Sequence, residues 1–262
     1  METFYLTVTY ILVGLVGLCV GSFLNVVIYR LPEGMSLVRP KSHCTKCNYE
    51  LKWYDNIPVL SYIILGGKCR NCKTHISFRY TAVELANMLL WLTCVLLFWK
   101  QNIALSIIYM AVISVFICVF FIDLEHKIIF DRFQIILLCL GVACIFLDKS
   151  VSWYSHLIGG AAGFAVFFLL AFLFEKIVKK EGLGGGDVKL SGVAGLILGW
   201  KKLLLSLLVA SLLAVIVIAI FPKNKDEKSK EFPFAPFLTV GFTVAMLFGS
   251  NIISWYLSLF GI

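Results

Sequence analysis

The chain has 262 residues, of which 60% are hydrophobic, and its mean hydropathy is +0.94. These values argue against a soluble protein and predict a polytopic membrane protein, because several apolar stretches are long enough to cross a bilayer. The net charge of +8 would suit a nucleic-acid-binding protein. In a membrane protein, however, an excess of Lys and Arg more often marks cytoplasmic loops. We therefore expect the lipid bilayer as a partner and no nucleic acid.

The first apolar run differs from a cleavable signal peptide. Residues 1–4 carry no positive charge, the run is longer than the apolar core of a signal peptide, and the positive Arg30 follows the run. This order predicts a membrane anchor with its N-terminus outside.

The hydropathy pattern predicts an all-α fold with about eight transmembrane helices and a small cytoplasmic domain. The expected spans are 5–29, 80–98, 103–122, 132–147, 153–177, 188–199, 203–221 and 233–260. The sixth span is short and rich in small residues, namely Ser191, Gly192, Gly195 and Gly199. Such a span is either a half-helix or a helix that packs closely against its neighbours.

The distribution of positive charge predicts the topology. Segments 30–79, 123–132, 176–189 and 222–231 hold 9, 2, 4 and 4 Lys and Arg residues, and the opposite side holds only Lys100, Lys149, Lys201 and Lys202. The first group is therefore expected in the cytoplasm, with both termini outside. The sixth span must cross the membrane for this to hold, because otherwise the lysines in 222–231 would face outward.

Two aspartates lie at the predicted membrane boundary. Asp123 ends the apolar run that begins near Ile103, and Asp187 opens another run directly after three glycines. The predicted topology places both at the cytoplasmic end of their spans. Either aspartate alone is equally well explained as a helix cap. A pair at one depth favours acid–base chemistry, in which one carboxylate activates water and the other, protonated, polarises a carbonyl.

The glycines at 182 and 184–186 predict a place where another backbone approaches closely, such as an extended substrate. The alternative is a flexible linker. A phosphate-binding loop is excluded, because no Gly-Lys-Ser/Thr sequence follows.

Four cysteines in the large cytoplasmic loop predict a metal site. They form two Cys-x-x-Cys pairs about twenty residues apart, at Cys44, Cys47, Cys69 and Cys72. This spacing in a reducing compartment favours a closed, structural zinc site over disulfides. His43 and His75 flank the pairs and are expected to be supporting or solvent-facing residues. The other five cysteines fall inside spans and are expected to be small apolar side chains.

Two polar residues near span ends also stand out. Asn25 is expected to make an interhelical hydrogen bond. Glu84 inside a span requires a partner, such as Arg30, Arg79 or a substrate group.

These motifs together resemble the type IV prepilin leader peptidases, which are bifunctional peptidases and N-methyltransferases of type IV pilus and type II secretion systems. The resemblance covers nearly the whole chain. It rests on residues 21–32, the two Cys-x-x-Cys pairs, residues 79–85, 122–131, 184–189 and 233–237. One position departs from the pattern, because Phe130 stands where members commonly have proline.

The resemblance implies specific roles. Asp123 and Asp187 would be the catalytic pair, the second within a Gly-x-Gly-Asp motif, and neither Glu125 nor Asp131 would replace them. The four cysteines would bind zinc in a cytoplasmic domain associated with methyl transfer from S-adenosylmethionine. Candidate methyl-transfer residues are Gly67, Lys68 and Glu84.

The resemblance also implies the domain order, the substrates and the location. The expected parts are a first transmembrane helix (1–29), a zinc-binding domain (30–79) and a transmembrane peptidase domain (80–262). Substrates would be prepilins or pseudopilins, cleaved after glycine on the cytoplasmic face of the bacterial inner membrane. An ion- or proton-coupled transporter and a zinc-bearing scaffold without chemistry remain the alternatives.

Overall fold

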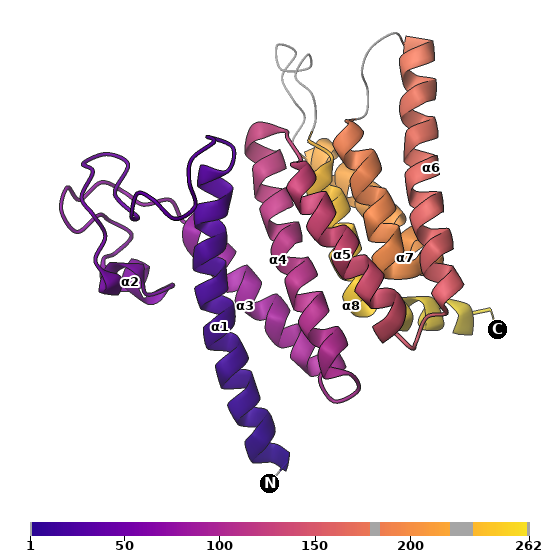
Figure 1. The fold of residues 1–262 in the computed structure, drawn as a ribbon, viewed down its shortest axis with the longest axis horizontal. Coiled ribbons are helices and arrows are strands. Elements are labelled where there is room, and N and C mark those ends of the chain that lie inside the picture. The colour runs from indigo at the N-terminus through magenta and orange to yellow at the C-terminus, as the bar shows by residue number, and fades with distance from the viewer. Residues whose placement is uncertain (1, 179–183, 221–232, 261–262) are drawn as a thin grey trace. The chain divides into compact units, whose positions relative to one another are not determined.

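The computed structural model describes residues 2–178, 184–220 and 233–260. Within these residues every regular element is a helix, and extended pairing is limited to two isolated bridges, His43 with Glu50 and Lys68 with His75. The chain divides into two compact units, Met1–Lys100 and Gln101–Ile262 (Figure 1). The predicted all-α class is thus confirmed for the part of the chain that the structure describes.

The first unit is built on two antiparallel helices, α1 (Glu2–Arg30) and α3 (Arg79–Phe98). Glycines let their backbones approach: a Cβ built at Gly21 would lie only 2.7 Å from Glu84 Cα, and one at Gly17 would lie 3.1 Å from Met88 Cα. Two buried asparagine side chains form hydrogen bonds between the helices. Asn87 Nδ2 donates to Gly17 O at 2.8 Å, and Asn25 Nδ2 donates to Tyr80 O at 2.9 Å. The predicted interhelical role of Asn25 is confirmed.

Between these helices the chain forms a small domain with little regular structure. Its only helices are the 3-10 turn η1 (Trp53–Asn56) and the short α2 (Leu60–Ile64), among residues that the structure describes throughout this segment.

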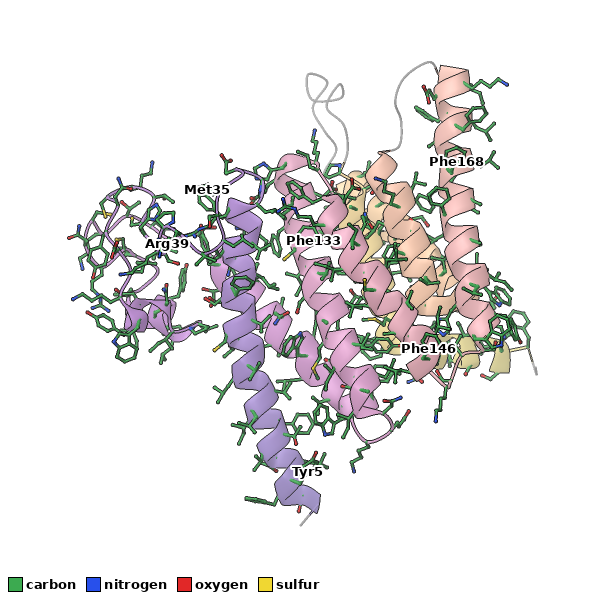
Figure 2. The ribbon with its side chains drawn as sticks, in the orientation of Figure 1. Tyr5, Met35, Arg39, Phe133, Phe146 and Phe168 are labelled. Carbon is green, nitrogen blue, oxygen red and sulfur yellow. The ribbon has the colours of Figure 1, made fainter. Side chains whose placement is uncertain are left out.

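The second unit contains α4 (Ile103–His126), α5 (Asp131–Leu147), α6 (Trp153–Val178), α7 (Gly185–Ile220) and α8 (Ala235–Ser258). The start of α4 is tied to the end of α5, because Asn102 Nδ2 donates to Leu147 O at 2.8 Å and Tyr109 Oη donates to Asp148 Oδ2 at 3.0 Å. Large apolar side chains such as Phe146 and Phe168 are exposed on the outside of the helices (Figure 2). An apolar exterior of this kind is suited to lipid rather than water.

Helix α7 turns back on itself at Gly199. The backbone of Gly199 has φ 75° and ψ 163°, a conformation that favours glycine. A Cβ built at Gly163 of α6 would touch both the Ser191 carbonyl and Leu203 Cδ2. In a straight helix Ser191 and Leu203 would be about 18 Å apart. The two parts of α7 therefore run side by side.

Small residues bring α6 and α7 together. A Cβ at Gly159 would collide with the Gly195 carbonyl oxygen, and a Cβ at Gly195 would collide with the Gly159 carbonyl oxygen. The close packing predicted for the glycine-rich span at 188–199 is therefore present. Such close approach of backbones is a main source of helix association in membranes, where burial of apolar surface contributes little.

Six helices of the described residues are long and apolar enough to cross a membrane: α1, α3, α4, α6, α7 and α8. The predicted eight spans are not confirmed. Helix α5, expected at 132–147, has only 17 residues. The spans expected at 188–199 and 203–221 both lie within α7 and meet at Gly199, where the backbone leaves the helical conformation.

Replacing Gly159 with alanine should destabilise the second unit, because the new methyl group would meet the backbone of α7. We expect a loss of about 1–3 kcal/mol, the usual cost of overpacking. Thermal unfolding in detergent would measure it. The neighbouring Gly160→Ala is the control, since its Cβ would have no neighbour nearer than 3.4 Å. Equal melting temperatures for the two variants would contradict the close contact.

Candidate functional site

Asp123 lies in the last turn of α4. Lys127 ends the helix in a left-handed conformation (φ 56°), and its N–H donates to Asp123 O at 2.9 Å. The Asp123 side chain is buried at 6% exposure. Its carboxylate accepts a hydrogen bond from the Ala235 N–H. The other oxygen, Oδ2, is buried without a hydrogen-bond partner among the described residues.

Asp187 lies in the first turn of α7, in the same unit. Its N–H donates to Gly184 O at 3.0 Å, which forms the turn at the helix start. Its Oδ1 is also buried and lacks a partner within the described part of the chain. The carboxyl groups of Asp187 and Asp123 are close enough to interact electrostatically. The structure therefore brings together two carboxyl groups that are 64 positions apart in the sequence.

The glycines before Asp187 differ in their surroundings. A Cβ at Gly186 would lie 3.0 Å from Ile129 Cβ, in the loop that joins α4 to α5. Gly185 has nothing within 4 Å of its Cβ position, and Gly184 has only Asp187 Oδ2 at 3.6 Å. Gly186 is thus required for packing, whereas the space beside Gly184 and Gly185 is open. Gly182, the other glycine for which a close backbone approach was predicted, lies outside the described residues.

The start of α8 and Gln134 have no role that the sequence pattern predicts, yet both contact the aspartate region. The first N–H groups of a helix carry partial positive charge, and here Ala235 at the start of α8 donates to Asp123. Gln134 Nε2 of α5 donates to Gly186 O at 3.2 Å, which holds the start of α7. The prolines at 233 and 236 signal the beginning of α8, but not which side chain it faces.

The other nearby carboxylates are in a different environment. Asp131 forms an exposed ion pair with Lys189, with Asp131 Oδ1 at 2.6 Å from Lys189 Nζ, and Glu125 is also exposed. Phe130, which replaces the family's proline, precedes α5 with φ −72°. Proline is fixed near that value, so phenylalanine here preserves the backbone conformation of the turn.

An apolar groove of about 620 Å³ lies on the other face of α7. Lys189 lines it, and Lys189 is about 200° around the helix from Asp187. The groove is therefore separate from the aspartate pair. Its lining comes from α5, α6 and α7: Asp131, Gln134, Ile135, Leu138, Leu157, Gly160, Ala161, Phe164, Lys189, Gly192, Val193 and Leu196.

The four predicted metal-binding cysteines form one cluster in the first unit. The Sγ atoms of Cys44, Cys47, Cys69 and Cys72 all lie within 4.8 Å of one another, and none is in a disulfide. A tetrahedral zinc with Zn–S bonds of about 2.3 Å requires sulfurs about 3.8 Å apart. Cys44 and Cys72 are 3.8 Å apart. The donor set and its size therefore fit zinc.

The two Cys-x-x-Cys turns repeat the same backbone pattern. Cys44 N–H donates to Tyr49 O, and Cys69 N–H donates to Thr74 O. The residue after each second cysteine, Asn48 or Lys73, has φ of 55° or 58°. The turns thus present their sulfurs from equivalent positions. His43 and His75 are not in the cluster, in agreement with the prediction.

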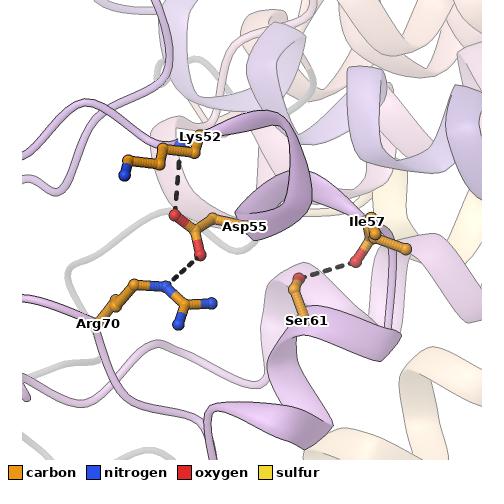
Figure 3. Close-up of polar contacts among 5 residues, drawn as sticks. All are labelled: Lys52, Asp55, Ile57, Ser61 and Arg70. Atoms are coloured by element: carbon orange, nitrogen blue, oxygen red, sulfur yellow. Dashed lines mark hydrogen bonds and ion pairs between the residues drawn. The ribbon is translucent and has the colours of Figure 1, made fainter.

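Polar contacts support the second cysteine turn. The Thr74 hydroxyl and N–H lower the pKa of the Cys72 thiol to about 6, which favours the thiolate that a metal requires. Arg70 Nε donates to the buried Asp55 Oδ1 at 2.7 Å, and Lys52 N–H donates to Asp55 Oδ2 at 3.2 Å (Figure 3). Asp55 thus joins η1 to the loop that carries Cys69 and Cys72.

The three candidate methyl-transfer residues lie at the two ends of α2. Glu84 Oε2 accepts a hydrogen bond from Val59 N–H at 2.8 Å, directly before α2. Gly67 follows α2 with φ 67°, and a Cβ there would lie 2.9 Å from Tyr62 Oη. Lys68 pairs with His75 in an isolated bridge. Each of the three therefore has a structural role within the first unit.

The described residues thus define a helical membrane protein with a buried Asp123 next to a half-buried Asp187, and with a separate four-cysteine cluster. Residues 15–98 match the bacterial peptidase A24 N-terminal domain, and residues 110–219 match the type IV leader peptidase family. The chain belongs to this family of prepilin peptidases.

Several curated proteins named prepilin leader peptidase/N-methyltransferase are similar to the chain. The protein from Aeromonas hydrophila is 35% identical over 95% of this chain and 94% of its own length. The one from Pseudomonas aeruginosa is 33% identical over 94% and 93%. The one from Myxococcus xanthus is 39% identical over 77% of this chain but only 59% of its own length. No solved structure matches the chain.

Gly186→Ala should disturb the start of α7, because the added methyl group would press on Ile129 in the loop that joins α4 to α5. We expect a lower melting temperature in detergent, corresponding to about 1–3 kcal/mol. Gly185→Ala should leave the melting temperature near that of the wild type, because its Cβ position is open. If both variants were equally stable, Gly186 would not be packed as the structure shows.

Proposed function

We propose that the chain is a membrane aspartic endopeptidase that removes the basic leader of type IV prepilins or pseudopilins after a glycine. It then methylates the new N-terminal amine. The observation that carries the proposal is the pair Asp123 and Asp187, each with a buried carboxylate oxygen that lacks a partner among the described residues. The names of the relatives support it, since they combine peptidase and N-methyltransferase.

In the proposed chemistry the two carboxyl groups share the acid and base roles. Two carboxylates at one site do not easily ionise together, so one retains a proton while the other is charged. The charged group accepts a proton from water, and that water attacks the carbonyl carbon of the glycine before the scissile bond. The protonated group donates its proton to the carbonyl oxygen, which gives a tetrahedral intermediate. The intermediate then collapses: the C–N bond breaks, the carboxyl group that took the proton from water gives it to the leaving amine, and the other carboxylate takes back the proton from the oxygen. The unpaired oxygens of Asp123 and Asp187 are free to make these contacts.

The Ala235 N–H has a supporting role in this scheme. It donates to the Asp123 carboxylate from the start of α8, where the helix dipole favours negative charge. The open space beside Gly184 and Gly185 leaves room for a substrate backbone to approach Asp187.

The proposed topology has eight crossings with both termini outside. Helix α5 crosses despite its 17 residues, and α7 crosses twice because it turns at Gly199. A span shorter than the bilayer is accommodated by local thinning. This topology places Asp123, Asp187 and the cysteine cluster on the cytoplasmic side of the bacterial inner membrane. A prepilin leader would then remain in the cytoplasm while its hydrophobic helix lies in the bilayer.

The functional parts are proposed as the first helix (1–29), the cytoplasmic domain (30–79) and the peptidase domain (80–262). The cysteine cluster would hold one structural zinc ion, whose role is to fix the fold of the cytoplasmic domain. S-adenosylmethionine would supply the methyl group when bound, and the surroundings of α2 between Glu84 and Gly67–Lys68 are the candidate region for it. The relatives favour this function over an ion- or proton-coupled transporter.

Asp123→Asn and Asp187→Asn should each reduce prepilin cleavage by about 10³-fold or more, because each removes an acid–base group without changing side-chain size. Intact-mass spectrometry of a prepilin incubated with the purified protein and S-adenosylmethionine would measure both leader loss and methylation. A prepilin supplied without its leader should still be methylated by both variants.

Asp131→Asn is the matched control for these variants. Its carboxylate is exposed and its ion pair with Lys189 is worth at most about 1 kcal/mol, so cleavage should stay within a few-fold of wild type. Near-normal cleavage by either the Asp123 or the Asp187 variant would remove that residue from the proposed pair.

Cys47→Ala should abolish binding of the proposed zinc ion, because three thiolates leave the tetrahedral site incomplete. Metal analysis of the purified protein should find about one zinc per chain in the wild type and much less in the variant. Cys19→Ala, at an exposed position of α1, should retain the metal. A wild-type protein without zinc, or a Cys47 variant that retains it, would contradict the site.

A further inference from the structure

The short helix α2 exposes an apolar surface within the otherwise strongly basic cytoplasmic domain. Leu60, Ile63 and Ile64 are 50%, 66% and 70% exposed, and they share one helix face because they are three and four positions apart. Phe78, 60% exposed, contacts a different face of α2, with its ring 6.3 Å from that of Tyr62. Exposed apolar clusters of this kind mark contact with a protein or a membrane.

The attachment of α2 decides between these two partners. Glu84 of α3 accepts the Val59 N–H at 2.8 Å, so the start of α2 is held beside the second turn of that helix. Glu84 Cα is level with Gly21 of α1, since a Cβ at Gly21 would lie 2.7 Å from it. Gly21 is nine residues before the end of α1 at Arg30, which is about 13 Å along a helix.

A glutamate side chain in a helix points back toward the helix start, so Val59 lies nearer the membrane surface than Glu84 Cα does. Even so, α2 begins at a depth where α1 is still apolar. Helices that lie in the membrane interface bury their apolar face about 5–10 Å below the headgroups. The attachment of the start of α2 to Glu84 of α3 agrees with that depth.

The charge pattern around α2 agrees with a lipid partner. Residues 56–67 contain no charged side chain, whereas segment 30–79 as a whole holds nine Lys and Arg and only three acidic residues. Basic residues on both sides of an uncharged apolar segment are attracted to anionic headgroups while the segment enters the acyl region.

We propose that the α2 face, defined as Leu60, Ile63 and Ile64, is a lipid-contacting surface. It inserts into the leaflet in which α1 ends and α3 begins. The hydrogen bond from Val59 to Glu84 sets the depth of insertion. The cytoplasmic domain (30–79) is then held against the membrane by the apolar contact of α2, as well as by its chain connections to α1 and α3. This inference does not depend on the proposed peptidase activity.

Photo-crosslinking of the full-length protein tests the proposal. Benzoylphenylalanine would be placed at position 64, or at position 41 as the control, because Lys41 lies in the same domain with a side chain that is 78% exposed. The protein would be reconstituted in vesicles of phosphatidylethanolamine and phosphatidylglycerol, irradiated and examined by mass spectrometry. We expect at least about tenfold more lipid adduct at position 64 than at position 41.

Equal lipid labelling at the two positions would overturn the proposal, as would labelling at position 64 that goes only to a second protein chain. A second measurement guards against disturbance by the bulky label. Tryptophan introduced as Ile64→Trp should be quenched by brominated phospholipid, whereas tryptophan introduced as Lys41→Trp should not. Absence of added quenching for Ile64→Trp, in a variant that melts like the wild type, would also overturn it.

Discussion

The central constraint in this structure is that two aspartates share a buried region where their charges repel each other. Burial makes charge costly, and proximity makes two charges more costly still. The start of α8 offsets part of this cost, because the Ala235 N–H donates to Asp123. Asp187 lies in the first turn of α7, where the helix dipole favours a carboxylate. The ends of three helices must therefore meet at one place.

The second unit is arranged so that these ends can meet. The turn at Gly199 folds α7 into two adjacent parts, and the Gly159–Gly195 contact holds the first part against α6. Gln134 of α5 fixes the start of α7 through Gly186 O. Without small residues at these contacts the backbones would be separated by side chains, and the position of Asp187 relative to Asp123 would change. Glycine packing thus determines the geometry of the carboxylate pair from a distance.

The domain between α1 and α3 in the first unit is small and has little regular structure, so its apolar core is also small. Two equivalent cysteine turns gather four sulfurs within 4.8 Å, and the buried Asp55 links Arg70 to the backbone of Lys52. Glu84 then joins α2 to the pair of membrane helices. The cysteine cluster, the ion pair of the buried Asp55 with Arg70 and one hydrogen bond to α3 replace the extended apolar core of a larger domain.

The sequence by itself determined the helical membrane class, the grouping of four cysteines at metal-ligand spacing and the choice of Asp123 and Asp187 as candidate acid–base residues. These follow from local properties, namely hydropathy over about twenty residues, ligand spacing and charge at span ends. Only the tertiary structure decided that α7 folds back at Gly199, that Ala235 donates to Asp123, and that Asp131 pairs with Lys189 instead. Likewise, hydropathy indicated two apolar stretches at 188–199 and 203–221, but only the structure shows that they meet at Gly199 and lie side by side. Contacts between distant segments depend on how backbones pack, and no local pattern encodes which segments will meet.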